Sequence, residues 1–241
     1  MAQIPRLYID QDLAQGQTLT LSREAANYIF AVMRLMAGAP LEIFNGRDGT
    51  FAAEVVNGNK RGGLLLCLDR IAPQMMSPDL WLFFAPVKKS QTDFIVQKAV
   101  ELGASRLCPV QSHFTNSERA RTDKMRVQVL EAAEQCGINY VPDVSEYEKL
   151  SRVLDTWPQD RRLLFCDERA RGAPMSELTP DMAGAWGVLV GPEGGFSDGE
   201  RAQLRGLPFA TSTSLGPRIL RAETAAVAAL SLWQIHLGDW T

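Results

Sequence analysis

The sequence predicts an α/β protein in two parts, a small strand-rich part followed by a larger part in which strands alternate with helices. Short strand patterns dominate residues 4–71, with one helical pattern among them, whereas strand and helix patterns alternate from residue 80 onward. Such alternation is typical of a mostly parallel sheet that helices cover on both faces. Residues 72–79 contain two prolines and are predicted to link the two parts.

The first part is expected to form a small β-barrel, because several short strands with one helix are typical of that fold. Asn45-Gly46 and Asp48-Gly49 lie between two strand patterns and are strong hairpin signals. Ser22 is a good N-cap for a helix predicted over residues 23–35. The predicted strands cover residues 4–9, 18–21, 41–44, 50–56 and 63–71.

The second part is expected to carry the parallel sheet. Ser197 and Glu200 form a capping box that defines the start of one helix. The last helix is apolar nearly all round and is therefore expected to be largely buried. Strands are predicted at residues 80–85, 106–110, 140–144, 163–166, 186–190 and 209–215. Helices are predicted at residues 92–102, 122–136, 147–156, 198–204 and 222–237.

Composition limits the classes of function. The net charge of −3 gives no global basic field for nucleic acid, so any RNA site has to rest on local features. The four cysteines are far apart and only two histidines are present, so no metal site is expected. The first residues lack the pattern of a signal peptide, and no apolar run approaches the ~20 residues of a membrane span. A soluble, cytoplasmic protein is expected.

The segment Gly191–Gly195 follows an apolar strand and precedes a capped helix. One glycine would satisfy a tight turn, but three within five residues indicate that something approaches the backbone closely. The segment lacks both nucleotide-binding glycine patterns, and the carboxylate of Glu193 would repel a phosphate. These features favour a ligand without phosphates, such as S-adenosylmethionine. Alternatively, Glu193 accepts backbone amides of its own loop.

A second glycine-containing loop, Leu215–Arg221, connects the last strand to the last helix. Gly216-Pro217 forces a sharp turn there. Arg218 and Arg221 stand just before the helix. They are either ordinary surface arginines or contacts for a substrate phosphate or base.

Six sequence strings occur in the order and combination of one known family. They are IPRLY at 4–8, VQKAVELG at 96–103, EAAEQCG at 131–137, VPDV at 141–144, GPEGGFS at 191–197 and LGPRILRAETAA at 215–226. On these strings, which span nearly the whole chain, the sequence resembles the RsmE family of 16S rRNA uracil-N3 methyltransferases. That family belongs to the SPOUT class of knotted methyltransferases.

The resemblance implies a PUA-like RNA-binding β-barrel over residues 1–72 and a SPOUT-type parallel sheet with a C-terminal trefoil knot over residues 73–241. Knots are too rare for sequence patterns to predict one. It also implies a homodimer, and S-adenosyl-L-methionine held in the knot by the loops after three successive strands. The residues of this chain at those positions are Asp167, Glu168, Gly191, Pro192, Glu193, Gly194, Gly195, Leu215, Gly216, Ile219 and Leu220.

The implied activity is methylation of N3 of uridine 1498 in the 16S rRNA of the small ribosomal subunit. Uracil N3 carries a proton, so transfer requires a nearby base or a cation that stabilises the developing anion. Arg221 is expected to supply the cation, with Glu223 and, less favoured, Glu168 as bases. In one departure from the family, Ile138 and Tyr140 occupy positions where members commonly carry arginine.

Local basic residues are the expected contacts for 16S rRNA or the small ribosomal subunit, unless they only face solvent. They are Arg6, Arg34, Lys88, Lys89, Arg119 and Arg121. Two other classes of protein stay open at this point. A non-catalytic RNA-binding protein that kept the fold would not need the intact glycines or Arg221. An enzyme for a phosphorylated nucleotide is disfavoured by Glu193 and the missing phosphate patterns.

Overall fold

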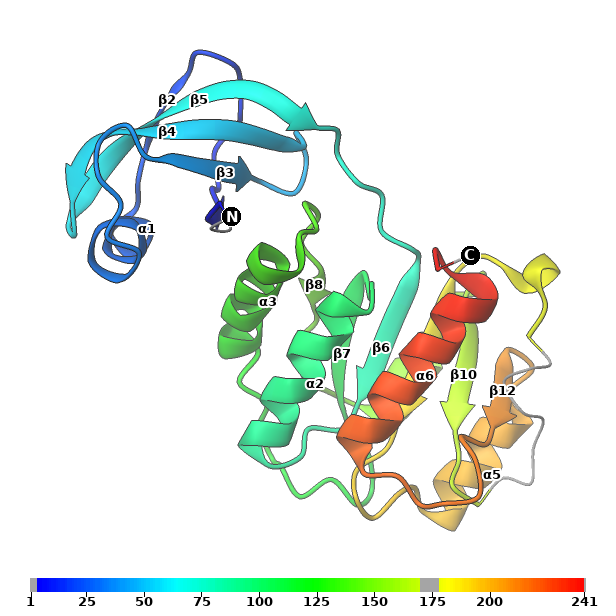
Figure 1. Cartoon of the computed structure of the whole chain (residues 1–241). Helices are drawn as coiled ribbons and strands as arrows, with labels where there is room; N and C mark the ends of the chain where they lie inside the picture. The colour runs from blue at the N-terminus through cyan, green and yellow to red at the C-terminus, as the bar shows by residue number, and fades with distance from the viewer. Residues whose placement is uncertain (1–3, 170–177, 241) are drawn as a thin grey trace. The chain divides into compact units, whose positions relative to one another are not determined.

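The computed structural model describes residues 4–169 and 178–240, which form two compact units (Figure 1). The first unit contains the residues up to Met76 together with Ala133–Val141. The second contains Ser77–Ala132 and the residues from Pro142 onward. Helix α3 (Thr122–Cys136) therefore begins in the second unit and ends in the first.

The first unit is built on one five-stranded sheet in the order β1-β3-β4-β5-β2. The strands are β1 (Arg6–Tyr8), β2 (Thr18–Thr20), β3 (Pro40–Phe44), β4 (Thr50–Asn59) and β5 (Gly62–Ala72). The β1–β3 pair is parallel and the other pairs are antiparallel. The predicted hairpin is confirmed, since Gly46 and Gly49 adopt φ of 82° and 96° between β3 and β4.

The helix of the first unit differs from the regular one predicted over residues 23–35. Ser22 caps it as predicted, accepting the Ala25 N–H at 3.1 Å, but α1 (Arg23–Asn27) ends after five residues. A π-helix, η1 (Tyr28–Val32), continues the chain. Its Phe30 ring packs on the hairpin of β4 and β5, where a Cβ atom on Gly63 would lie 2.7 Å from the ring. The π-helical turn, which replaces the predicted α-helix, thus packs its Phe30 ring against β4 and β5.

The segment Ala133–Val141 is held to the first unit by hydrogen bonds. Asn139 is buried, and its amide donates to Thr50 Oγ1 at 3.1 Å and to the carbonyl of Pro73 at 2.8 Å. Its Oδ1 accepts the N–H of Met75 at 2.8 Å. A strand was predicted at residues 140–144, but only Asp143–Val144 (β8) pairs in a sheet. The preceding residues instead pack with the first unit.

The second unit carries the predicted parallel sheet, in the order β12-β10-β11-β6-β7-β8, with β9 paired to β7. All of these pairs are parallel. The carboxyl ends of the strands therefore meet at one edge, where open α/β sheets bind their ligands. The strands, besides β8, are β6 (Leu80–Phe84), β7 (Arg106–Gln111), β9 (Glu148–Lys149), β10 (Arg162–Cys166), β11 (Trp186–Val190) and β12 (Ala210–Thr213).

Helices cover both faces of this sheet. In Figure 1, α2 (Lys89–Glu101), α3 and α6 (Ala222–Leu237) lie on one face. On the other face, α4 (Leu150–Asp155) and α5 (Asp198–Gly206) pack their leucines against Phe83 and Phe165 of the strands. A short 3-10 helix, η3 (Pro180–Met182), precedes β11. Within the described residues, no helix has both the length and the apolar character needed to cross a membrane.

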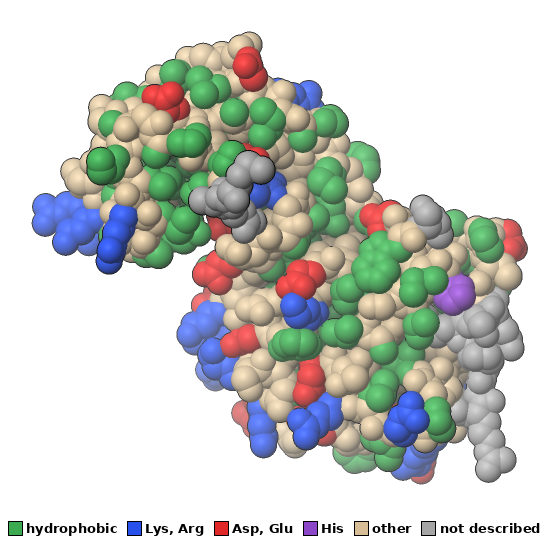
Figure 2. All heavy atoms as spheres, viewed as in Figure 1, with side chains coloured by type: hydrophobic (Ala, Val, Ile, Leu, Met, Phe, Trp, Pro, Cys, Tyr) green, Lys and Arg blue, Asp and Glu red, His purple; other side chains and the backbone are tan. Residues whose placement is uncertain are grey.

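The last helix has the predicted bounds, but the expectation that it is largely buried is wrong for one side. Ala226, Leu230 and Trp233 are buried, whereas Ile235 is 49% exposed. Figure 2 shows hydrophobic side chains open on the face of the second unit that carries α6. The sequence thus predicts an apolar helix, but it does not predict which side of that helix the rest of the chain covers.

The chain crosses the carboxyl edge of the sheet between β12 and α6. Strand β12 lies at the edge of the sheet beside β10, whereas α6 packs against α2 and β11. Residues 214–221 therefore run back past the ends of the central strands, as Figure 1 shows. This crossing brings the second glycine loop next to the first.

Candidate functional site

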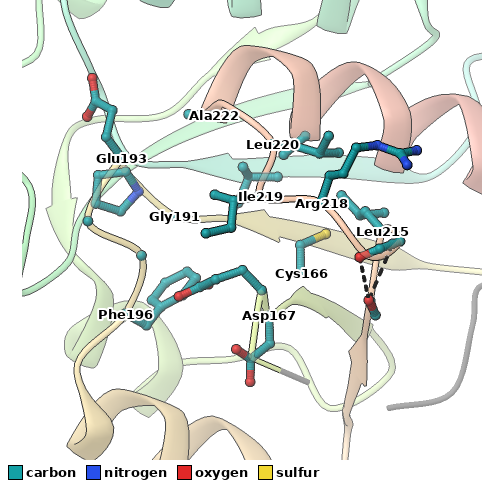
Figure 3. A pocket seen from close by; sticks show the side chains of 18 residues that line it. Cys166, Asp167, Gly191, Glu193, Phe196, Leu215, Arg218, Ile219, Leu220 and Ala222 are labelled. Carbon is teal, nitrogen blue, oxygen red and sulfur yellow. Dashed lines mark hydrogen bonds between the residues drawn. The ribbon is translucent and has the colours of Figure 1, made fainter. Parts of the chain in front are cut away.

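The three loops expected to hold a cofactor meet in one pocket at the carboxyl edge of the sheet (Figure 3). They follow β10, β11 and β12, which are neighbours in the sheet, in the order β12-β10-β11, and run parallel, so that their carboxyl ends lie side by side. Every residue expected to contact the cofactor lines this pocket. The lining also includes Cys166, Val190, Phe196, Ser214, Arg218, Ala222 and Ala225, which were not among the expected residues.

The glycines of the first loop are required by crowding from the protein itself. Gly195 has φ of +65°, and a Cβ atom there would collide with the Glu168 carboxylate and lie 3.1 Å from Arg201 Nη2. A Cβ atom on Gly191 would lie 2.8 Å from the Phe196 ring. The sequence predicted that something lies close to the backbone of these glycines. The structure confirms this, and at Gly191 and Gly195 the close groups are side chains of the protein itself. Glu193 is exposed, and in Figure 3 its carboxylate points away from Cys166.

The predicted capping box is confirmed and makes an additional contact. Ser197 Oγ accepts the N–H of Glu200 at 3.3 Å, and Glu200 Oε2 accepts the N–H of Ser197 at 2.9 Å. Glu200 Oε1 also accepts the N–H of His113, at 2.7 Å. The capping carboxylate therefore ties the loop after β7 to the start of α5, beside the glycine loop.

Arg201 of α5 is the structural centre of the site, and it was missed in the sequence. Its side chain is only 5% exposed, and its Nε donates to Asp167 Oδ1 at 3.1 Å. It also donates to the Glu168 carboxylate and to the carbonyl of Phe196. One guanidinium thus joins the loop after β10 to the loop after β11. The four-residue spacing of Arg201 and Arg205 placed both on one helix face, but nothing in the sequence showed that this face is buried.

Asp167 is held as a carboxylate. Burial raises its pKa, but the backbone N–H of Arg169 and the guanidinium groups of Arg201 and Arg205 outweigh burial and lower the pKa below its ordinary value. Arg205 Nη2 lies 2.5 Å from Asp167 Oδ2. Because both oxygens are occupied by structural partners, Asp167 stabilises the pocket wall and is unsuited to proton transfer.

Cys166 contributes a neutral thiol to the pocket. Burial raises the pKa of this thiol to about 12. In Figure 3 its sulfur lies among the pocket-lining side chains of Leu215, Ile219 and Leu220. The thiol is therefore uncharged at neutral pH.

The second glycine loop turns sharply at Gly216, as predicted, with φ of 112°. Ser214 Oγ lies 3.3 Å from both the N–H and the carbonyl oxygen of Gly216, shown as dashed lines in Figure 3. The loop leads into α6, whose first turn reaches the pocket through Ala222 and Ala225. A helix N-terminus carries partial positive charge, so this end of the pocket favours anionic groups.

The two residues expected to be catalytic lie next to the pocket but are not part of its lining. Arg221 is the exposed N-cap residue of α6, and its side chain makes no capping hydrogen bond. Glu223 is half-buried in the first turn of the helix. Arg218 does line the pocket. Glu168, the less favoured base, is paired with Arg201.

Four of the basic residues expected to contact RNA lie on or near the same edge of the sheet. Lys89, Arg119 and Arg121 line a second pocket after β6 and β7, and Lys88 is the exposed N-cap residue of α2. Lys124 joins them in the lining. Some of this charge is balanced, because Lys89 pairs with Asp93 and Arg121 with Asp123. Figure 2 shows basic side chains along this margin of the second unit, with acidic ones among them.

The other two, Arg6 and Arg34, belong to the first unit and differ from each other. Arg34 is exposed and adopts a positive φ of 56°. The side chain of Arg6 is only 10% exposed, and it donates to the carbonyl of Ile138 at 3.1 Å and pairs with Glu42 at 3.3 Å. Arg6 therefore packs within the first unit, and the RNA contact expected for it stays a prediction.

Two family models match the sequence. The RNA methyltransferase domain matches residues 75–234, and the RNA methyltransferase PUA domain matches residues 21–65. The first match spans more than half of the chain and contains all three loops of the pocket. By fold and site the protein is an RNA methyltransferase.

Relatives identify the family within this class. The ribosomal RNA small subunit methyltransferase E of Buchnera aphidicola is 31% identical over 98% of both chains. The protein of that name from Rickettsia conorii is 26% identical and aligns over 94% of this chain and 93% of its own. The chain belongs to the ribosomal RNA small subunit methyltransferase E family.

Solved structures share the whole fold. The Neisseria gonorrhoeae ribosomal RNA small subunit methyltransferase E, bound to S-adenosyl methionine, superposes with a TM-score of 0.90 at 28% identity, covering 99% of this chain and 100% of its own. A Legionella pneumophila methyltransferase in complex with S-adenosylmethionine gives 0.89 at 28% identity, covering 97% and 98%. Both neighbours thus bind this cofactor in the same overall fold.

Replacing Gly195 by alanine is expected to destabilise the protein by about 1–3 kcal/mol, because a side chain at positive φ is strained and its Cβ would displace Glu168 and Arg201. Gly199→Ala in α5 is the matched control, since a Cβ there meets nothing within 4 Å. The control should unfold at or slightly above the wild-type temperature. Thermal unfolding measures both, and equal melting temperatures for the two variants would refute the crowding argument.

Asp167→Asn is expected to destabilise the protein by about 3 kcal/mol at pH 7, because it removes the buried one of the two carboxylates paired with buried Arg201. The pKa of Asp167 is lower in the folded than in the unfolded chain, so its contribution is fully present above about pH 5 and is lost as the pH falls below about 4. The stability gap between wild type and variant should therefore shrink on acidification.

Urea unfolding at several pH values between 7 and 3 measures this gap. Asp160→Asn, which alters an exposed carboxylate, serves as the control and should change stability by less than about 0.5 kcal/mol. A gap for Asp167→Asn that stays constant over the whole range would show that the carboxylate is not held in its ionised form.

Proposed function

We propose that this protein transfers the methyl group of S-adenosyl-L-methionine to N3 of a specific uridine, uridine 1498, in the 16S rRNA of the small ribosomal subunit. The observation that carries the proposal is the meeting of three loops, after β10, β11 and β12, in one pocket of a chain from this rRNA methyltransferase family. The two SAM-bound neighbours support the cofactor, and the family supports the RNA.

The pocket suits the chemical parts of S-adenosylmethionine. Leu215, Ile219 and Leu220 offer an apolar wall for the adenine, and the first turn of α6 favours the carboxylate of the methionine part. Among the described residues, no lysine lines the pocket. A bulky triphosphate would meet the carboxylates of Asp167, Glu168 and Glu193, with Arg218 as the cation of the described lining. When bound, the cofactor supplies an electrophilic methyl group on a sulfonium.

Residues around the start of α6 are proposed to activate the acceptor nitrogen of the RNA. Methyl transfer is an in-line displacement, so the protein mainly has to align the acceptor nitrogen and exclude water. N3 of uracil becomes nucleophilic as its proton leaves, and a cation nearby stabilises the resulting negative charge. Arg221 is proposed to supply that cation and Glu223 to accept the proton. Arg218, which lines the pocket, is proposed to contact the cofactor.

The architecture is proposed to be that of the SPOUT class. Residues 73–241 would form the knotted methyltransferase domain, because residues 214–221 run back across the central strands before α6 packs on α2. Residues 1–72 would form the PUA-like RNA-binding barrel, which agrees with the PUA match to residues 21–65.

RNA is proposed to lie along the carboxyl edge of the sheet. Lys88, Lys89, Arg119 and Arg121 would neutralise phosphates there, and Arg34 would do so on the first unit. A homodimer is supported by the open apolar side of α6, which includes Ile235. The substrate places the proposed enzyme in the cytoplasm.

Transfer of a labelled methyl group from S-adenosylmethionine to the small subunit or to 16S rRNA tests the proposal, with the product nucleoside identified by mass spectrometry. The expected product is N3-methyluridine at one position. Calorimetry should show binding of S-adenosylhomocysteine and none of ATP or NAD. Cofactor binding without methyl transfer to either RNA form would favour a non-catalytic RNA-binding protein instead.

Arg221→Ala is expected to lower kcat by about 100-fold, the usual loss when one group that stabilises a transition-state charge is removed. Its affinity for S-adenosylhomocysteine should stay within about twofold of wild type, because Arg221 does not line the pocket. Arg218→Ala should weaken that affinity. Arg152→Ala, an exposed arginine of α4 paired with Glu148, is the control and should leave both quantities unchanged. A wild-type kcat for Arg221→Ala would show that Arg221 does not stabilise the transition state.

A further inference from the structure

A tight turn directly after β7 presents two aromatic rings to solvent. The N–H of Thr115 donates to the carbonyl of Ser112 at 3.1 Å, and the N–H of Ser112 donates to Thr115 Oγ1 at 2.9 Å. The two hydroxyl groups lie 3.0 Å apart and form a further hydrogen bond. His113 and Phe114 occupy the tip, where both are exposed. The turn is therefore closed by its own hydrogen bonds and holds these two residues in place.

The turn is fastened to the wall of the cofactor pocket at two points. The N–H of His113 donates to Glu200 Oε1, the capping carboxylate of α5. Phe114 packs on Gly194, since a Cβ atom on that glycine would lie 3.0 Å from the Cβ of Phe114. Because Gly194 lines the pocket, Phe114 stands at its rim.

Phe114 is 43% exposed although it packs on Gly194. Its ring and that of His113 form a T-shaped pair, with centroids 4.7 Å apart and planes at 82°, so His113 covers at most one face of the phenyl ring. Ile219, 85% exposed, is an open apolar side chain within the pocket lining itself. Large apolar side chains that stay exposed beside a binding pocket indicate a surface that a ligand covers.

The same segment leads from this aromatic ring to a group of cations. Arg119 and Arg121 follow Phe114 by five and seven residues and line the second pocket together with Lys89. An aromatic platform followed by cations in the same segment matches a nucleotide, which combines a flat base with a phosphate. Neither an aliphatic nor a purely anionic ligand would use both features.

We infer that Phe114 binds the acceptor uracil by stacking on its face, while Arg119 or Arg121 holds a neighbouring phosphate. This inference rests on the proposed function and adds a substrate-binding residue to it. Stacking occupies the face of the base and leaves its Watson–Crick edge free. The N3 atom on that edge can then point into the pocket toward the methyl group.

Phe114→Ala tests the inference in the full-length protein. We expect kcat/KM for the RNA substrate to fall by about tenfold or more, as is usual when a base loses its aromatic platform. Phe114→Tyr, which keeps a ring, should stay within about threefold of wild type. Affinity for S-adenosylhomocysteine and the melting temperature should not change in either variant.

Phe94→Ala is the matched control, because this phenyl ring on α2 is 40% exposed and lies away from the pocket lining. Light scattering on all variants shows that assembly is unaltered. Equal losses for Phe94→Ala and Phe114→Ala, or an unchanged kcat/KM in Phe114→Ala, would overturn the inference. A parallel loss of S-adenosylhomocysteine affinity would also overturn it, because Phe114 would then only support the cofactor loop.

Photo-cross-linking separates this inference from the proposed function. RNA transcribed with 5-iodouridine should cross-link to the tryptic peptide 107–119, which contains Phe114, in the wild type but not in Phe114→Ala. If the wild type transfers no methyl group yet forms this cross-link, the methylation proposal fails and the uracil contact stands. If methylation proceeds without the cross-link, the uracil contact fails alone.

Discussion

The buried ion pair between Arg201 and Asp167 is the interaction on which the site depends. A buried charge is costly unless it is paired and hydrogen-bonded, and Arg201 satisfies this requirement with groups from two different loops. Its position on α5 is defined by the capping box at Ser197. Helix α5, the glycine loop after β11 and the end of β10 are therefore positioned relative to each other by charged hydrogen bonds. Apolar packing alone would allow these three elements to shift more.

The loops of the pocket are consequently preorganised. Gly191, Gly194 and Gly195 each have a side chain of the same protein where their own would lie, so the loop has little room to move inward. Glu200 also fixes the turn after β7, because its carboxylate accepts the N–H of His113. A methyltransferase that only aligns two reactants gains most of its rate from such fixed geometry. The rigid surroundings thus explain how a pocket made of loops can act as a precise template.

Local features of the fold were predictable from the sequence because local chemistry determines them. The β11 strand, α3 and α6 have their predicted bounds, and the capping box and the turn at Gly216 are present. The resemblance to a family supplied the third loop and the cofactor. Long-range features were not predictable: the burial of Arg201, the π-helix at Tyr28–Val32 and the open side of α6 all depend on which distant residues pack nearby. The placement of Asn139 in the first unit is of the same kind.

That placement has a consequence for synthesis on the ribosome. Asn139 pairs with Thr50, 89 residues earlier, and with Pro73, 66 residues earlier. The first unit therefore lacks part of its structure until more than half of the chain has emerged, whereas N-terminal domains generally fold as soon as they are complete. Buried Thr50 and the carbonyl of Pro73 lack their hydrogen bonds until Asn139 is translated, which happens after the first strands of the second unit. The two units are thus coupled in their order of folding, and neither is a module that can be exchanged by a single recombination event.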